Sequence, residues 1–116
     1  MTDFQRDLEV LINEGVIAAN NKRIRFFMRY GNRLKGDIEL LDLSTRGFNC
    51  LKRKRINTIE DVGNNFHNLG RIAGIGITTV KEVKNKYLAY YYANLNNEER
   101  KDFWRDTVEA TIDMEG

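Results

Sequence analysis

Four polar residues at helical spacing make residues 44–55 the first candidate for binding a ligand. Arg46 and Asn49 lie three residues apart, which places them on one face of a helix, and Lys52 and Arg53 extend that face. Arginine suits the narrow minor groove of A-tracts, where negative potential is concentrated, and asparagine offers a donor and an acceptor. The pattern favours contact with a polyanion. An exposed basic helix without a ligand is the ordinary alternative.

Two glycines around one apolar residue, Gly74-Ile75-Gly76, form the second candidate. Glycine permits backbone angles that other residues resist, so the pair predicts a tight connection between two helices, which we call the glycine hairpin. The free amides of residues 76–79 and the helix dipole would attract an anion, with Thr78 and Thr79 beside it. Such a helix-hairpin-helix binds nucleic-acid backbones independently of sequence. A plain helix–helix turn, where glycine is also common, is the alternative.

Residues suited to catalysis or metal binding are scarce. Cys50 is the single cysteine and His67 the single histidine, so neither an internal disulfide nor a usual four-ligand zinc site can form. Because no acid, base and nucleophile cluster, we expect no enzyme, cofactor, metal or small-molecule substrate. Cys50 lies on an apolar stretch and is expected to pack as a small hydrophobe. The tyrosines of residues 87–92 are expected to pack in a core rather than stack on bases.

Helical spacing dominates the elements that would position these residues. It predicts a first helix over residues 4–12 and a second over about 24–34. A third helix is expected to begin after a Ser44 cap and to run to about residue 55, and a short fourth helix to begin after a Thr58 cap. A short helical turn around 68–73, a long helix from Thr78, and a last helix capped by Asn96 or Asn97 complete the prediction. Residues 37–43 are expected to form an extended lead-in. With no proline and no sustained strand-like alternation, the sequence predicts one all-α, compact multi-helix domain of about six helices.

Charge is distributed unevenly along the sequence. Residues 1–20 carry one base and four acids, a net charge of −3, and residues 21–55 carry eleven bases and three acids, a net charge of +8. Residues 56–95 carry four bases and three acids, a net charge of +1, and residues 96–116 carry three bases and seven acids, a net charge of −4. A basic middle between acidic ends favours a face that binds a polyanion. The apolar runs are too short to span a bilayer, and the first residues lack a secretion signal. We therefore expect no membrane contact and a cytoplasmic location.

The two candidate segments together resemble a known family. Leu43-Ser-Thr-Arg-Gly-Phe-Asn-Cys-Leu-Lys, with Ile56-Asn-Thr-Ile-Glu-Asp-Val, Gly74-Ile-Gly and Val80-Lys-Glu-Val after it, is similar to the C-terminal domain of the bacterial RNA polymerase alpha subunit over about residues 38–90. The Arg-x-x-Asn-Cys-Leu-Lys run, with its partners at the expected distances, is more specific than either motif alone. The resemblance implies a SAM-domain-like helical core with a helix-hairpin-helix, in a stand-alone relative with added helices at both ends.

By position, the resemblance implies DNA-binding residues at Arg46, Asn49, Cys50, Lys52, Gly76, Thr78 and Thr79. The basic helix face adds Arg53 and the glycine hairpin adds Gly74, which stands where the family often has asparagine, so nine DNA-binding residues are predicted. The family's minor-groove arginine corresponds to Arg46, and its DNA-contacting asparagine to Asn49. Ile77 and Thr78 stand where the family has lysines, which weakens the attraction for phosphate in the hairpin. The basic stretch over residues 22–33 is a candidate source of the missing charge.

The function implied by the resemblance is non-catalytic binding of A/T-rich duplex DNA through the minor groove and phosphates. It is transcription-related, with RNA polymerase or a transcription factor as the protein partner. A protein-interaction adaptor with little or no DNA binding is the main alternative, and an RNA-binding module is a third. The implied organisation is an N-terminal helical extension over residues 1–36, an alpha C-terminal domain-like core over 37–93, and a C-terminal helix over 94–116 that packs on the core or extends it.

Overall fold

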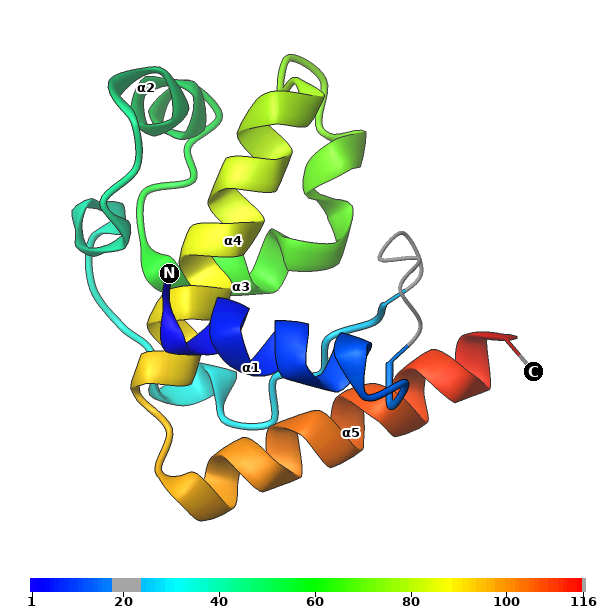
Figure 1. The fold of residues 1–116 in the computed structure, drawn as a ribbon. Helices are drawn as coiled ribbons and strands as arrows, with labels where there is room; N and C mark the ends of the chain where they lie inside the picture. Colours follow the sequence, from blue (N-terminus) through cyan, green and yellow to red (C-terminus); the bar gives the residue numbers. More distant parts are fainter. Residues whose placement is uncertain (18–23, 116) are drawn as a thin grey trace. The chain divides into compact units, whose positions relative to one another are not determined.

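Helices account for the regular structure of residues 1–17 and 24–115, the part of the protein that this computed structural model describes (Figure 1). The elements are α1 (Asp3–Asn13), the 3-10 helices η2 (Gly31–Arg33) and η3 (Ile38–Leu41), α2 (Thr45–Arg53), α3 (Ile59–Asn65), the 3-10 helix η4 (Phe66–Arg71), α4 (Ile77–Ala93) and α5 (Asn97–Glu115). The all-α prediction is confirmed. None of these helices is long and apolar enough to cross a membrane.

The helices belong to two compact units. Unit 1 combines Met1–Arg29 with Tyr92–Gly116, and unit 2 is the continuous segment Tyr30–Tyr91. All nine predicted DNA-binding residues lie in unit 2, which contains α2, α3 and most of α4. Unit 2 is therefore the unit whose packing decides the geometry of the candidate site.

Side-chain caps begin the helices where the sequence predicted them. The Ser44 hydroxyl accepts a hydrogen bond from the amide of Gly47 at the start of α2. Thr58 and Asp61 form a reciprocal capping box at the start of α3. Asn96 and Glu99 exchange the same pair of bonds before α5, which confirms Asn96 as the cap. Each cap satisfies amides that have no partner within the helix.

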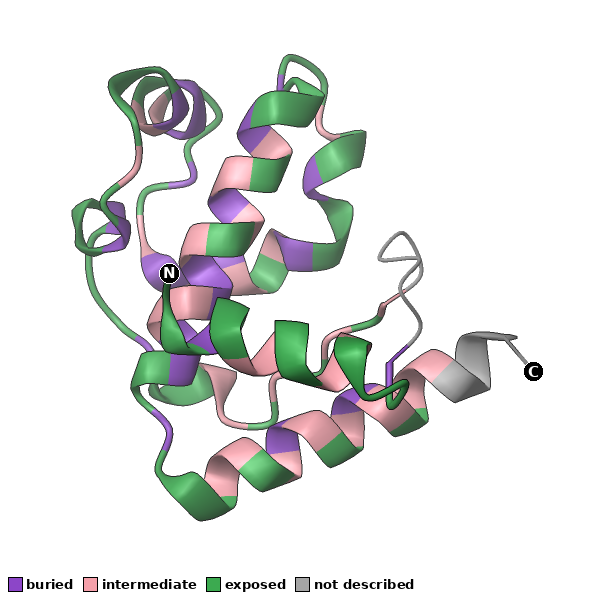
Figure 2. Cartoon of the chain, in the orientation of Figure 1, coloured by how far each residue is buried: buried purple, intermediate pink, exposed green. Residues whose placement is uncertain are grey.

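The core of unit 2 forms around the inward face of α4. Val83, Tyr87 and Tyr91 follow at helical spacing and are almost completely buried, and Figure 2 shows the buried positions of the helix in purple. The ring of Phe66 contacts that of Tyr87, with the two ring centroids 5.5 Å apart. Other buried apolar residues of the unit are Leu34, Ile38, Leu41, Cys50, Leu51, Ile56, Ile59, Val62 and Leu69. The predictions that the tyrosines pack and that Cys50 behaves as a small hydrophobe are confirmed.

The segment predicted as a helix over about 24–34 is not one. Residues 24–28 are irregular, and exposure alternates along them, so that Phe27 is 50% exposed while its neighbour Phe26 packs on Phe4 and Phe103. The amides of Arg25 and Phe27 donate to hydroxyls of α5 instead of to a helical carbonyl. Burial in this segment alternates with every second residue, whereas the sequence predicted that the apolar residues form one face of a helix. Lys22 and Arg23 lie outside the described residues.

The predicted extended lead-in over residues 37–43 was also wrong. The Asp37 side chain accepts from the amide of Glu39, and this cap starts η3. The start of η3 pairs with the start of α3, because the amide of Ile38 donates to the carbonyl of Asn57 and the amide of Ile59 donates to the carbonyl of Gly36. These bonds fix the approach of the backbone to α2.

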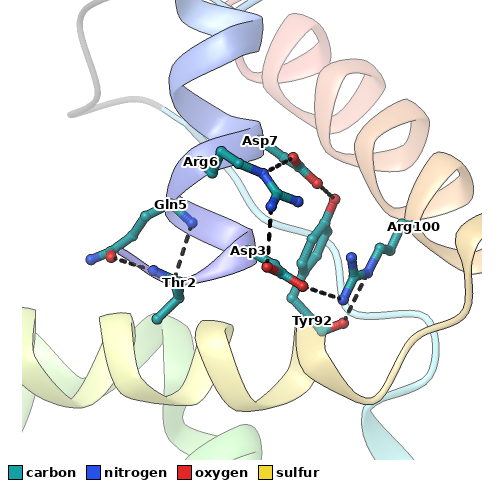
Figure 3. Close-up of polar contacts among 7 residues, drawn as sticks. All are labelled: Thr2, Asp3, Gln5, Arg6, Asp7, Tyr92 and Arg100. Carbon is teal, nitrogen blue, oxygen red and sulfur yellow. Dashed lines mark hydrogen bonds and ion pairs between the residues drawn. The ribbon is translucent and has the colours of Figure 1, made fainter.

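Unit 1 is held by aromatic packing and a polar network. The ring of Phe4 lies 5.8 Å from the rings of Tyr92 and Trp104. The Tyr92 hydroxyl donates to Asp7 and accepts from the indole of Trp104, as Figure 3 shows for the Asp7 side. Burial, together with the bond to Asp7, raises the pKa of Tyr92 to about 12. Trp104 therefore anchors α5 within unit 1.

Candidate nucleic-acid interface

Residues from α2 and from the glycine hairpin line one open pocket of unit 2, with a volume of about 480 Å³. Its lining comprises Ser44, Arg46, Cys50, Arg53, Gly74, Gly76, Ile77, Thr78, Thr79 and Glu82. The structure thus brings together seven of the nine predicted DNA-binding residues. The other two, Asn49 and Lys52, lie on α2 outside this lining.

A carboxylate from α4 ties the start of α2 in place. Glu82 accepts hydrogen bonds from the amide and the hydroxyl of Ser44, at 3.0 Å and 2.9 Å. A side chain at Gly47 would block this contact, because its Cβ would lie 2.1 Å from the Glu82 carboxylate. The contact fixes the helix that carries Arg46 against the helix that follows the hairpin. The amide of Ser44 and the dipole at the N-terminal end of α2 offset the negative charge of Glu82.

The glycine hairpin packs against the second half of α2. The Cys50 thiol lies 3.6 Å from the carbonyl of Gly74, within sulfur hydrogen-bond range. Gly74 has a φ of 87°, in the left-handed region that favours glycine. A Cβ there would also lie 2.8 Å from the ammonium of Lys54, so glycine leaves room for this lysine beside the hairpin.

The start of α4 leaves open space for a ligand. A Cβ added to Gly76 would meet no atom within 4 Å, so a phosphate can approach its backbone closely. The carbonyl of Gly76 accepts the first helical bond, from Val80. The amides of the three residues between them therefore have no partner within the helix. Amides at this position, together with the helix dipole, attract anions.

Four exposed bases lie on α2 or directly after it, and two of them, Arg46 and Arg53, line the pocket. We call Arg46, Arg53, Lys54 and Arg55 the basic cluster. All four are exposed, and none has an ion-pair partner among the residues that the structure describes. Lys52, the remaining base of α2, instead lies 3.5 Å from the carboxylate of Asp37 and 5.2 Å from the Phe48 ring centroid. The cluster can therefore attract a polyanion.

The bases of unit 1 are largely neutralised by nearby acids. Ion pairs with aspartate or glutamate hold Arg6, Arg29, Arg100, Lys101 and Arg105. Figure 3 shows two of these pairs, in which Asp3 contacts both Arg6 and Arg100. Arg29 had been a candidate source of charge for the hairpin, and it lies 2.9 Å from Asp106 instead. Among the residues that the structure describes, five of the six bases of unit 1 are paired with acids, whereas none of the four bases of the basic cluster is.

Three residues of this site were not singled out from the sequence. Lys54 and Arg55 follow the predicted helix face, but only the structure places Lys54 beside Gly74. Glu82 reaches Ser44 across 38 residues of sequence, which no local pattern reveals. The one local signal was a glycine inside a predicted helix, Gly47, since glycine weakens a helix unless another group needs the space.

These features define a class of protein, a small all-helical domain in which a basic helix and a glycine hairpin border one open pocket. A family model that describes the C-terminal domain of the alpha subunit of bacterial RNA polymerase matches residues 30–88, more than half of the sequence. The protein belongs to this family. Membership implies a transcription-related, non-catalytic DNA-binding domain, and the match covers most of unit 2.

A curated relative agrees with this membership. Over 53 residues the protein is 45% identical to the DNA-directed RNA polymerase subunit alpha of Oenococcus oeni. The matched residues make up 45% of this protein and 17% of that relative, so the similarity covers less than a fifth of the polymerase subunit. No solved structure matches the protein.

Proposed function

We propose that this protein binds A/T-rich duplex DNA through the minor groove and the flanking phosphates, as a non-catalytic module in transcription. The observation that carries the proposal is that Arg46, which is exposed and has no ion-pair partner among the described residues, lines the same pocket as the glycine hairpin. An arginine at the mouth of an open basic pocket suits the negative potential of a narrow minor groove.

Each part of the pocket has a separate role in the proposal. Arg46 enters the minor groove, with Asn49 beside it on the same helix contacting base edges or backbone. Arg53 and Lys54 contact phosphates on one side of the groove. The amides that follow Gly76 hold a phosphate on the other side, where the open space at Gly76 allows close approach. Cys50 supports the hairpin from beneath through Gly74.

Affinity titrations test the proposal. Fluorescence-labelled A/T-rich duplex, G/C-rich duplex and single-stranded RNA are titrated with wild-type protein and with Arg46→Ala at low salt. We expect the tightest binding to A/T-rich duplex, and a loss of about 1–3 kcal/mol in Arg46→Ala, the value of one good base contact. Arg105→Ala is the matched control, because Arg105 is paired with Asp102 in unit 1. Equal affinity of wild type and Arg46→Ala would refute the assigned contact.

A protein-interaction adaptor is the second candidate, and exposed apolar residues of unit 1 favour it. Phe27 and Val16 are each 50% exposed, and Val10 is 46% exposed. Such side chains suit a protein partner such as RNA polymerase or a transcription factor. Wild-type protein that binds none of the three nucleic acids at low salt would favour the adaptor over the DNA-binding module.

A further inference from the structure

A large aliphatic side chain stands on the wall of the basic pocket without a role in folding. Ile77 is the first residue of α4 and is 72% exposed. Single exposed aliphatic residues are common on protein surfaces. What distinguishes Ile77 is its place among ligand-binding groups, since it lines the pocket together with Arg46 and Arg53 and directly follows the open Gly76.

The surroundings of Ile77 indicate what it contacts. An apolar protein surface would leave the unpaired charges of Arg46 and Arg53 without a partner, at a cost in desolvation. A duplex backbone offers both chemistries, because phosphates alternate with the apolar faces of deoxyribose along the walls of the groove. In the proposed complex, the hairpin holds one phosphate and the arginines hold others. Ile77 shares the pocket with both and can therefore contact the sugar between these phosphates.

We propose that Ile77 packs on deoxyribose at the wall of the minor groove and supplies a part of the affinity that salt does not screen. This inference rests on the proposed DNA binding. Burial of apolar surface releases no counterions, whereas each phosphate contact adds about 0.9 to the slope of log affinity against log salt. Ile77 therefore contributes affinity that persists at high salt. A lysine at the same position would instead contribute affinity that is lost as salt is added.

The test compares the salt dependence of binding among variants. An A/T-rich duplex is titrated at several salt concentrations with wild type, Ile77→Ala and Ile77→Lys. Ile77→Ala removes three carbon atoms, and we expect affinity to fall about fivefold to tenfold at every salt concentration, with the slope unchanged. Ile77→Lys should steepen the slope by about 0.9, because it adds one phosphate contact.

Leu40→Ala is the matched control. Leu40 is a 53% exposed aliphatic residue of the same unit that lies outside the pocket lining, so its truncation should leave the affinity unchanged. Thermal unfolding of each variant confirms that the fold is retained. Ile77→Ala that binds like wild type, or loses affinity only through a changed slope, would overturn the inference. Wild-type protein that binds no duplex would instead refute the proposed function, so the two failures are distinguishable.

Discussion

Replacing Arg55 by glycine should strengthen the fold and weaken DNA binding at once. Arg55 follows α2, where its amide donates to Lys52 and the next amide, of Ile56, donates to Leu51. This pair of bonds is a Schellman motif, which favours glycine at its left-handed residue. Arg55 occupies that residue with a φ of 61°. The Arg55 side chain is exposed and has no hydrogen bond or ion pair with the residues that the structure describes, so no such contact offsets the backbone strain.

The magnitude follows from two opposing terms. A left-handed conformation costs a residue with a Cβ about 1–2 kcal/mol. Glycine avoids that cost, but its greater freedom in the unfolded state returns about 0.4–1 kcal/mol. The difference between the two ranges gives Arg55→Gly a net gain of about 0–1.6 kcal/mol, and the midpoint of about 0.8 kcal/mol corresponds to a melting temperature higher by about 2–6 °C. Loss of one phosphate contact should lower the slope of log affinity against log salt by about 0.9.

Thermal unfolding and DNA titration of the same variant provide the assay. Asp42→Gly is the matched control, because Asp42 also has a left-handed backbone, with a φ of 54°, but carries the opposite charge and does not belong to the basic cluster. It should raise the melting temperature by less, because aspartate tolerates the left-handed region better than arginine, and it should not lower the salt slope. Arg55→Gly protein that is less stable than wild type would refute the strain argument. An unchanged salt slope would remove Arg55 from the interface.

Three further predictions concern the pocket and its support. Gly76→Ala should keep the melting temperature, since its Cβ meets open space, yet weaken duplex binding; unchanged affinity would mean that no phosphate approaches there. Gly47→Ala should lower the melting temperature because its Cβ would lie 2.1 Å from Glu82, and a neutral result would contradict the Glu82 contact. The amide of Asn57 holds the pKa of Asp61 below its usual 3.8, so the stabilisation by Asp61 should be complete above that value and disappear as pH falls further. The free energy of unfolding of wild type and of Asp61→Asn is measured as the pH is lowered. Asp61→Asn should not show the loss of stability below pH 3.8 that wild type shows, and identical acid unfolding curves would exclude this role of Asp61.

Local signals explain which elements the sequence predicted. Ser44, Thr58 and Asn96 cap helices through atoms at most three residues away, so the boundaries of these helices were visible in the sequence. The spacing of Val83 and Tyr87 likewise revealed the buried face of α4, because helical periodicity is a property of neighbouring residues.

Contacts between distant residues explain the errors and omissions. The segment containing Phe27 is irregular because its amides find hydroxyls on α5, and Phe27 itself donates to Thr107, 80 residues later. Glu82 joins the site through Ser44, 38 residues earlier. Lys54 lies beside the glycine hairpin because Gly74 has no side chain to occupy that space. None of these contacts leaves a periodic pattern, so each required the folded structure.

Amide resonances of the labelled protein can show whether the basic cluster and the glycine hairpin share one DNA-binding face. A two-dimensional nitrogen–proton spectrum is recorded while A/T-rich duplex is added. We expect the amides of residues 46–55 and 76–79 to shift together and with one affinity, while those of α5 stay in place. Shifts confined to unit 1, or shifts of α2 without the hairpin, would contradict a single interface formed by both.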